Sequence, residues 1–249
     1  MELNISTLKA AIAKKSYKWF DDQINLIAVR TNLNVPDVFN DFLCTVWKQR
    51  PMPNGLTDTQ KQEWLKLNLF VGKDGKPLVA DGDFGTNSQF ALEQYNQLVG
   101  KERILIATIT TEPGITYQKK LLNKDGAWVM MPAQMINAYK PGLHQGKEDH
   151  TCLKSVGKIF GMRDNDLDGT AGNDKDAAPA KWVEGTTVGA NIHGSNKAGI
   201  TAKIGPWSAG CQVHNVWKNK EDMMSIAYSY KDVNNGLITY TLIEEKDLA

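Results

Sequence analysis

Apolar positions along this chain recur in two patterns, one with the period of a helix and one typical of strands. Near the start, Leu8, Ala11 and Ile12 fall on one side of a helical wheel and lysines on the other, which predicts a short amphipathic helix. Runs rich in β-branched and aromatic residues predict strands at 24–30, 37–47, 104–114, 126–135, 159–166 and 236–245. With a helical pattern at 220–233, these runs predict an α+β fold that is mainly β with peripheral helices.

The pattern changes after Arg50. The strand-like pattern is interrupted at 51–55 by a stretch that contains proline and glycine. Thr57, with Gln60 three residues later, is a capping-box pattern and predicts a helix that ends near Leu69.

The same capping-box pattern recurs at Thr86 and Gln89, ahead of a second helical periodicity. Insertions are tolerated best at exposed loop tips, where two adjacent strands turn. Because strand patterns stand on both sides of this helical block, we predict one discontinuous domain of residues 1–50 and 103–249, with a small helical module inserted at 51–102.

Composition narrows the class of protein. The chain has 249 residues, of which 41% are hydrophobic and 23% charged, and these values are ordinary for a globular protein. The formal net charge is +1 and no basic stripe occurs, so we do not expect nucleic acid as a partner. No apolar run approaches the roughly 20 residues that cross a bilayer, and residues 1–20 lack the apolar core of a secretory signal. We therefore expect a chain that is made in the cytoplasm and does not insert into a membrane.

Three cysteines are widely spaced and form no paired framework. Cys44 lies in an apolar run and is predicted to be part of the core. Cys152 could pair with either of the others. Cys211 differs from both, because the small residues Ser208 to Gly210 lead directly into it.

Cys211 follows His193 in a polar, glycine-dense stretch, which argues against a core position for either residue. A thiol becomes a useful nucleophile when a neighbouring base takes its proton. The run of Ser208 and Gly210 before the thiol lets backbone N–H groups approach closely enough to hold an oxyanion. The sequence therefore predicts a catalytic Cys–His pair.

These residues resemble the signature of the L,D-transpeptidase catalytic domain (the YkuD type), a histidine followed after a spacer by Ser/Thr-His-Gly-Cys. His193 matches the first half, and Ser208, Gly210 and Cys211 match the second. Ala209 departs from the signature, because it stands where the family has a second histidine. This departure leaves open whether the reaction is transpeptidation or hydrolysis.

The resemblance is closer to a group of phage and bacterial proteins that share a YKxGxHxG segment and a NIH…WSAGCQV segment. Residues 139–146 fit the first of these and 207–213 the second, and the resemblance covers most of 17–50 and 104–245. It implies a mainly-β L,D-transpeptidase-like domain and an acyl-enzyme on Cys211.

Further site residues follow from their place in these segments. His144 stands in a Gly-x-His-x-Gly setting and is the leading candidate to replace the missing histidine, whereas His150 is expected at the surface. Ser195 and Asn191 are candidates to orient the imidazole or contact the substrate. Trp207 either forms an apolar wall of the cleft or is a packed aromatic residue.

The inserted block resembles a peptidoglycan-binding module of the three-helix type, whose recurring element is Asp-Gly-x-Phe-Gly before the last helix. Asp81 to Gly85 matches that element, and Phe84 is expected to pin the turn to a small core. An ordinary helical hairpin is the alternative. If the block binds wall, Asp81 and Phe84 are its candidate contact residues.

Two stretches have the spacing of a metal site. Cys211 and His214 have C-x-x-H spacing, but zinc needs three or four ligands, and the glycine-rich setting suits a nucleophile better. Residues 164–169 copy the first half of a calcium loop, but the twelfth position is Lys175, with Asp174 or Asp176 as substitutes. We expect no metal and no cofactor.

The leading hypothesis is a cysteine peptidase or L,D-transpeptidase that acts on the stem peptides of bacterial peptidoglycan, as an endopeptidase or a carboxypeptidase. We expect a monomer that reaches the cell wall after release, as a phage lysin, as part of a virion or through a contractile secretion system. The alternative is a catalytically inactive wall-binding or virion structural protein, for which Ala209 is the best support.

Overall fold

The computed structural model describes residues 1–33, 35–171 and 179–248. Its strands are β1 (Asn25–Arg30), β2 (Asp41–Lys48), β3 (Glu102–Thr110), β4 (Ala127–Met130), β5 (Ala133–Leu143), β6 (Thr151–Ser155), β7 (Lys158–Asp164), β8 (Lys181–Glu184), β9 (Ile192–Gly194), β10 (Gln212–His214) and β11 (Ile238–Glu244). Its α-helices are α1 (Ile5–Lys14), α2 (Asp58–Leu67), α3 (Thr86–Leu98), α4 (Ile115–Lys119), α5 (Gly185–Val188) and α6 (Trp217–Ser229). Short 3-10 turns cover His144–Gly146, Gly205–Trp207, Val233–Gly236 and Glu245–Leu248.

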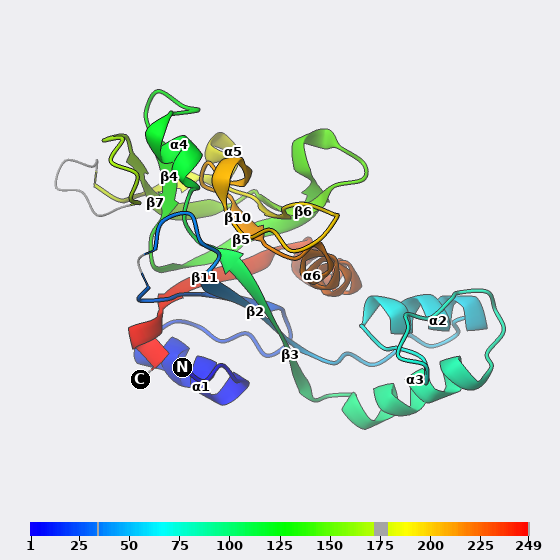
Figure 1. Ribbon diagram of the computed structural model, residues 1–249. Coiled ribbons are helices and arrows are strands. Elements are labelled where there is room, and N and C mark those ends of the chain that lie inside the picture. The colour runs from blue at the N-terminus through cyan, green and yellow to red at the C-terminus, as the bar shows by residue number, and fades with distance from the viewer. Residues whose placement is uncertain (34, 172–178, 249) are drawn as a thin grey trace.

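Eight strands in the described part of the chain close into a barrel, in the order β1-β11-β5-β6-β9-β10-β3-β2 (Figure 1). Two of its neighbouring pairs are parallel, β1 with β11 and β9 with β10. A separate three-stranded sheet, β4-β7-β8, lies beside the barrel together with α4 and α5. This architecture agrees with the prediction of a mainly-β domain with helices around it.

The central strand β1 is buried on both faces, which explains why it reads as a continuous apolar run. Leu26 and Ala28 belong to the main core, which joins the barrel to β4, β7 and α6. Ile27 and Val29 belong to a second core on the other side. Helix α1 closes that second core with the predicted apolar face of Leu8, Ala11 and Ile12.

The chain leaves the barrel at the end of β2 and returns at the start of β3, and these two points are neighbours. Strands β2 and β3 are antiparallel neighbours, and Lys48 pairs with Glu102. One residue further on, the N–H of Gln49 donates to the carbonyl of Lys101 at 2.8 Å. The block has a core of its own, formed by Leu65, Phe70, Leu78, Ala91 and Tyr95. Figure 1 shows α2 and α3 projecting from the barrel beyond α6.

A buried polar junction fixes the block to the barrel. The Arg103 guanidinium donates to the Gln49 side chain (2.9 Å) and to the carbonyl of Asn68 (2.7 Å). It also stacks between the rings of Trp47 and Phe70, at 4.9 and 4.6 Å from their centroids. Burial lowers the pKa of Arg103 to about 10. The block is therefore rigidly seated rather than flexibly tethered.

Local predictions for the helices of the block have different outcomes. The capping box of Thr57 and Gln60 is confirmed, and its helix ends two residues before Leu69, which has a φ of +59°. The second capping box is wrong. Thr86 is the first helical residue of α3, and Gly85 occupies the N-cap position without a side-chain hydrogen bond. Gly85 has the extended backbone conformation that an N-cap residue needs, so the helix begins at the next residue, Thr86.

The three cysteines are free, and Cys44 is buried as predicted. Cys152 is buried as well, so the pairing considered for it does not occur. In the acidic turn at 164–169, Asp166 and Asp168 accept backbone N–H groups two residues ahead. Positions 174–176, which would complete a calcium loop, lie outside the described residues. No helix among the described residues has the length and apolar character needed to span a bilayer.

Candidate functional site

Strands β9 and β10 place the predicted nucleophile and base on one surface. They run parallel, and Gln212 pairs with Ile192. Cys211 and His193 flank this pair. Because side chains alternate along a strand, both project from the face opposite to Ile192, which belongs to the barrel core.

A cavity of about 240 Å³ opens on this face. It is lined by Cys211, His193, His144, Asn191 and Trp207, which come from three separate stretches of the chain. Trp207 is 38% exposed and stands at the rim, so it forms part of the cavity wall and is not a packed core residue. The thiol of Cys211 donates to the carbonyl of Gly189 at 3.5 Å, on the opposite wall.

Gly210 lies against Trp128, and this contact shapes the turn before the nucleophile. A Cβ at Gly210 would stand 2.6 Å from Trp128 backbone and side-chain atoms, and the residue has a φ of +130°. The N–H of Trp128 also donates to the carbonyl of Ala209 at 3.1 Å. Glycine is therefore required here for two separate reasons, conformation and space.

Ser208 stabilises the turn that precedes Cys211 through hydrogen bonds of its side chain. Its side chain is buried, and its hydroxyl lies 2.7 Å from the carbonyl of Cys211 and 3.3 Å from that of Glu112. The same hydroxyl accepts the N–H of Gly210 at 3.2 Å. Ser208 is therefore placed to position the turn and does not line the cavity.

This arrangement corrects part of the oxyanion prediction. The amide of Gly210 is occupied by Ser208, so it does not face a substrate. The amide of Cys211 has no hydrogen-bond acceptor among the residues that the structure describes. Of the two amides predicted to hold an oxyanion, only that of Cys211 is available.

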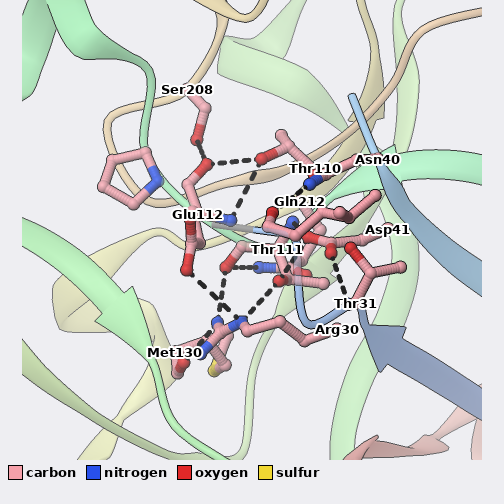
Figure 2. A network of polar contacts seen from close by, with 12 residues as sticks. Arg30, Thr31, Asn40, Asp41, Thr110, Thr111, Glu112, Met130, Ser208 and Gln212 are labelled. Carbon is pink, nitrogen blue, oxygen red and sulfur yellow. Dashed lines mark hydrogen bonds and ion pairs between the residues drawn. The ribbon is translucent and has the colours of Figure 1, made fainter. Parts of the chain in front are cut away.

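A polar network extends from Ser208 into the barrel (Figure 2). Glu112 pairs with Arg30 across 3.6 Å, and Arg30 donates to the hydroxyl of Thr111 at 2.8 Å. That hydroxyl donates to Asp41 at 2.6 Å. Burial raises the pKa of Glu112, and the neighbouring Arg30 opposes the rise. The network ties the nucleophile turn to β1, β2 and β3.

The ring of His193 is oriented by its own backbone. Nδ1 lies 2.9 Å from the carbonyl of Gly194, which can only accept, so Nδ1 carries the proton and Nε2 is the basic nitrogen. The prediction that Ser195 orients the imidazole is wrong, because its hydroxyl donates to Thr201 at 2.7 Å. Ser195 is buried and does not line the cavity. The side chain of Asn191 accepts the N–H of Ser155 at 3.1 Å.

Three histidine rings pack together at the site. The centroid of His144 lies 4.1 Å from that of His193 and 4.8 Å from that of His150. His150 also contacts the ring of Trp217. The ammonium group of the buried Lys220 lies 3.8 Å from the centroid of that ring. The surface position predicted for His150 is therefore corrected to a half-buried one. The six-residue separation from His144 gave no sign of the contact, which depends on the turn between them.

Burial keeps both members of the predicted catalytic pair, His193 and Cys211, neutral. Burial, together with the adjacent His144, lowers the pKa of His193 to about 3. Burial raises the pKa of the Cys211 thiol to about 11, and a backbone hydrogen bond from Asn191 acts in the opposite direction. At neutral pH the resting site therefore contains a thiol and an uncharged imidazole rather than an ion pair.

The zinc alternative finds no geometric support. Cys211 and His214 are three residues apart on an extended chain, so their side chains project from opposite faces. His214 is fully buried, and neither ring nitrogen has a hydrogen-bond partner among the described residues. No group of three or more His, Cys, Asp or Glu side chains in the described part of the chain is arranged to hold a metal.

The two candidate residues of the inserted block shape its loop. Asp81 accepts from the Gln62 side chain at 3.1 Å and from the N–H of Asp83 at 3.0 Å. Phe84 packs against the core of the block, as predicted. Asp81 lines a separate cavity of about 380 Å³, and Phe84 does not.

Sequence reasoning missed several residues of the site. Tyr117, Leu122, Trp128, Val188 and Gly189 also line the cavity. They come from α4, the turn after it, β4, α5 and the residue that ends α5. Only tertiary structure brings these elements to β9 and β10, so no local signal could have identified them.

No family model, no curated protein and no solved structure matches this chain. The grounds for proposing a function are therefore the geometry of the site and the resemblance of its motifs.

Proposed function

We propose that this protein is a cysteine-dependent enzyme that cleaves or exchanges peptide bonds in the stem peptides of peptidoglycan, with Cys211 as nucleophile and His193 as base. One observation carries the proposal. Cys211 and His193 line the same cavity, and the carbonyl of Gly194 fixes the tautomer in which Nε2 of His193 can take a proton.

The neutral resting pair determines the order of events. As Sγ of Cys211 attacks the substrate carbonyl carbon, its proton passes to Nε2 of His193, and the carbonyl π electrons move to oxygen. The free amide of Cys211 is the donor that can receive this oxyanion. Collapse of the tetrahedral intermediate breaks the C–N bond, and the imidazolium returns the proton to the departing amine. The thioester is then resolved by water in hydrolysis or by an amine in transpeptidation.

The substrate class follows from the resemblance of the motifs around His193 and Cys211, which implies a carbonyl next to a meso-diaminopimelate or lysine centre. The cavity is of a size for one or two residues of an extended peptide, and exposed Leu122 and Trp207 give it an apolar rim. An L,D-transpeptidase-like fold and a wall-binding role for 51–102 are parts of the same proposal.

A second candidate is an inactive wall-binding or virion protein. The observation that favours it is the strong burial effect on the pair, which raises the pKa of Cys211 to about 11 and lowers that of His193 to about 3. A base as weak as this His193 takes a proton reluctantly. The two candidates differ in whether Cys211 forms a covalent acyl adduct.

The deciding experiment is digestion of purified peptidoglycan, with the fragments identified by mass spectrometry. We expect the parent protein to release or exchange stem-peptide fragments and Cys211→Ala to do neither while keeping its fold by circular dichroism. A thiol-reactive carbapenem should form a stable adduct on Cys211. Digestion retained by Cys211→Ala would reject the mechanism, and an inert parent protein that forms no adduct would favour the inactive candidate.

A further inference from the structure

A second cavity, of about 230 Å³, adjoins the one that holds Cys211. The two share four wall residues, Tyr117, Leu122, Val188 and Ala209, so they form one continuous groove. Tyr117 and Val188 belong to α4 and α5, which Figure 1 shows at the same end of the barrel. A peptide bound at the nucleophile can therefore extend into this second cavity.

Charge is distributed unevenly along the groove. The walls of the Cys211 cavity carry histidines but no acidic side chain, lysine or arginine. The second cavity carries one fully charged group, the guanidinium of Arg163 on β7. One Nη1 hydrogen of Arg163 is used by the carbonyl of Gly126 at 2.9 Å. Among the described residues, no carboxylate forms an ion pair with it.

The position of Arg163 is set by the same residue that shapes the nucleophile turn. In the pairing of β4 with β7, Arg163 is the direct partner of Trp128, and its guanidinium lies 5.6 Å from the Trp128 ring centroid. Trp128 in turn contacts Gly210, the residue before the nucleophile. Burial lowers the pKa of Arg163 while Asp125 raises it through space, so the guanidinium is partly stripped of water. A partly desolvated guanidinium with free donors binds anions more strongly than an exposed one.

Resting on the proposed function, we propose that the second cavity is a subsite for a free carboxylate of the peptide substrate, and that Arg163 is the residue that binds it. A guanidinium offers a planar pair of donors that matches the two oxygens of a carboxylate. Ala209 contributes to this arrangement, because its small side chain lies in the wall that both cavities share and leaves the groove open.

Stem peptides supply such a carboxylate from three sources, the C-terminal residue, the second carboxyl of meso-diaminopimelate and the free α-carboxyl of γ-linked D-glutamate. The chemistry at Arg163 is the same in each case. A C-terminal carboxylate at the subsite would favour release or exchange of the last residue. A diaminopimelate carboxylate would instead select the chemotype of the cell wall.

The test measures binding without catalysis. The Cys211→Ala protein is titrated calorimetrically with a synthetic tetrapeptide, L-Ala-γ-D-Glu-meso-diaminopimelate-D-Ala. The peptide is used as the free acid and as three monoamides, at the C-terminal carboxyl, at the second diaminopimelate carboxyl and at the α-carboxyl of D-Glu. We expect one of the three amides to bind about 30-fold more weakly than the acid, the scale of one charge-assisted pair. The amide that loses affinity identifies the source of the carboxylate.

The same titrations are repeated with Arg163→Met and Arg163→Lys in the Cys211→Ala background. Arg163→Met should bind all four peptides with the weak affinity of the sensitive amide, and Arg163→Lys should recover part of the difference. Lys158→Met is the matched control, because it removes a positive charge from the same strand outside the groove. It should bind the acid as the parent does. Circular dichroism checks that each variant is folded.

Failure of this proposal is distinguishable from failure of the proposed function. Equal affinity for the acid and all three amides, or no measurable binding of the acid, would overturn the carboxylate subsite. Unchanged discrimination in both Arg163 variants would also overturn it. Selective binding by a protein that never digests peptidoglycan would keep the subsite and reject the enzyme.

Discussion

Gly210 shows how narrowly the nucleophile turn is specified at the scale of single residues. Its N–H is held by Ser208, its positive φ excludes most side chains, and Trp128 fills the space where a Cβ would stand. The sequence run from Ser208 to Cys211 predicted a close approach of backbone N–H groups to an oxyanion. It could not indicate the contact with Trp128, which lies far away in the chain.

We expect Gly210→Ala to lose activity and to unfold at lower urea concentration, with a loss of about 2 kcal/mol or more from strain and overpacking. Gly55→Ala is the matched control, because Gly55 also has a positive φ, +76°, but a methyl group added there would meet no atom within 4 Å. That control should lose only about 1 kcal/mol. Equal losses in the two variants would contradict the role given to Trp128.

The neutral pair of Cys211 and His193 predicts an unusual pH profile. Since the thiol titrates near 11 and the imidazole near 3, neither changes charge between pH 6 and 9. We expect kcat/KM on a soluble stem peptide to be nearly flat across this range. His193→Gln should lower it by about two orders of magnitude or more throughout. An acid limb with an apparent pKa near 6.5 in the parent would contradict the neutral pair.

At the scale of elements, most strands could be predicted from their apolar runs, whereas their order in the barrel could not. The run at 24–30 became β1 and the run at 236–245 became β11. Their pairing joins opposite ends of the sequence, and nothing in either run specifies the partner. The same holds for Arg163, whose place in the groove depends on the pairing of β4 with β7.

Strand β10 carries a buried histidine, and this predicts sensitivity to acid. Burial lowers the pKa of His214 to about 3 from an ordinary 6.5, so between these values the unfolded chain binds one more proton than the folded one. Stability therefore falls as pH falls through this window, by at most about 1.4 kcal/mol per pH unit for this residue. His214→Leu should be neutral or mildly stabilising at pH 7 and should gain a growing advantage over the parent by pH 5. Urea unfolding at the two pH values measures the difference, and an unchanged gap would contradict the buried neutral ring.

At the scale of the whole molecule, residues 51–102 form a block that is inserted between paired strands and clamped by Arg103. The change of residue pattern after Arg50 predicts an insertion at 51–102. It could not predict the clamp, in which Arg103 reaches Gln49, Asn68 and Phe70. Arg50 adds an ion pair with Asp232 at 2.8 Å.

Excising 51–102 and joining Arg50 to Arg103 through a short Gly/Ser bridge should leave a folded barrel, because Gln49 and Lys101 are already hydrogen-bonded neighbours. We expect it to be less stable than the parent, since Arg103 loses two partners. It should process soluble stem peptides but bind intact sacculi more weakly, as measured by sedimentation with sacculi. A truncated protein that binds sacculi as well as the parent would contradict the wall-binding role, and one that fails to fold would make the block part of the barrel's core.

The pairing of β1 with β11 has a consequence for how the chain folds during synthesis. The barrel wall stays open until β11 emerges from the ribosome, and until then β1 and β5 expose strand edges that can pair with other chains. Contacts between such distant segments close slowly. Strand β10, which directly follows Cys211, lies beside an incomplete barrel during this interval. Chaperone demand and aggregation should therefore be highest before β11 has been made and has paired with β1 and β5.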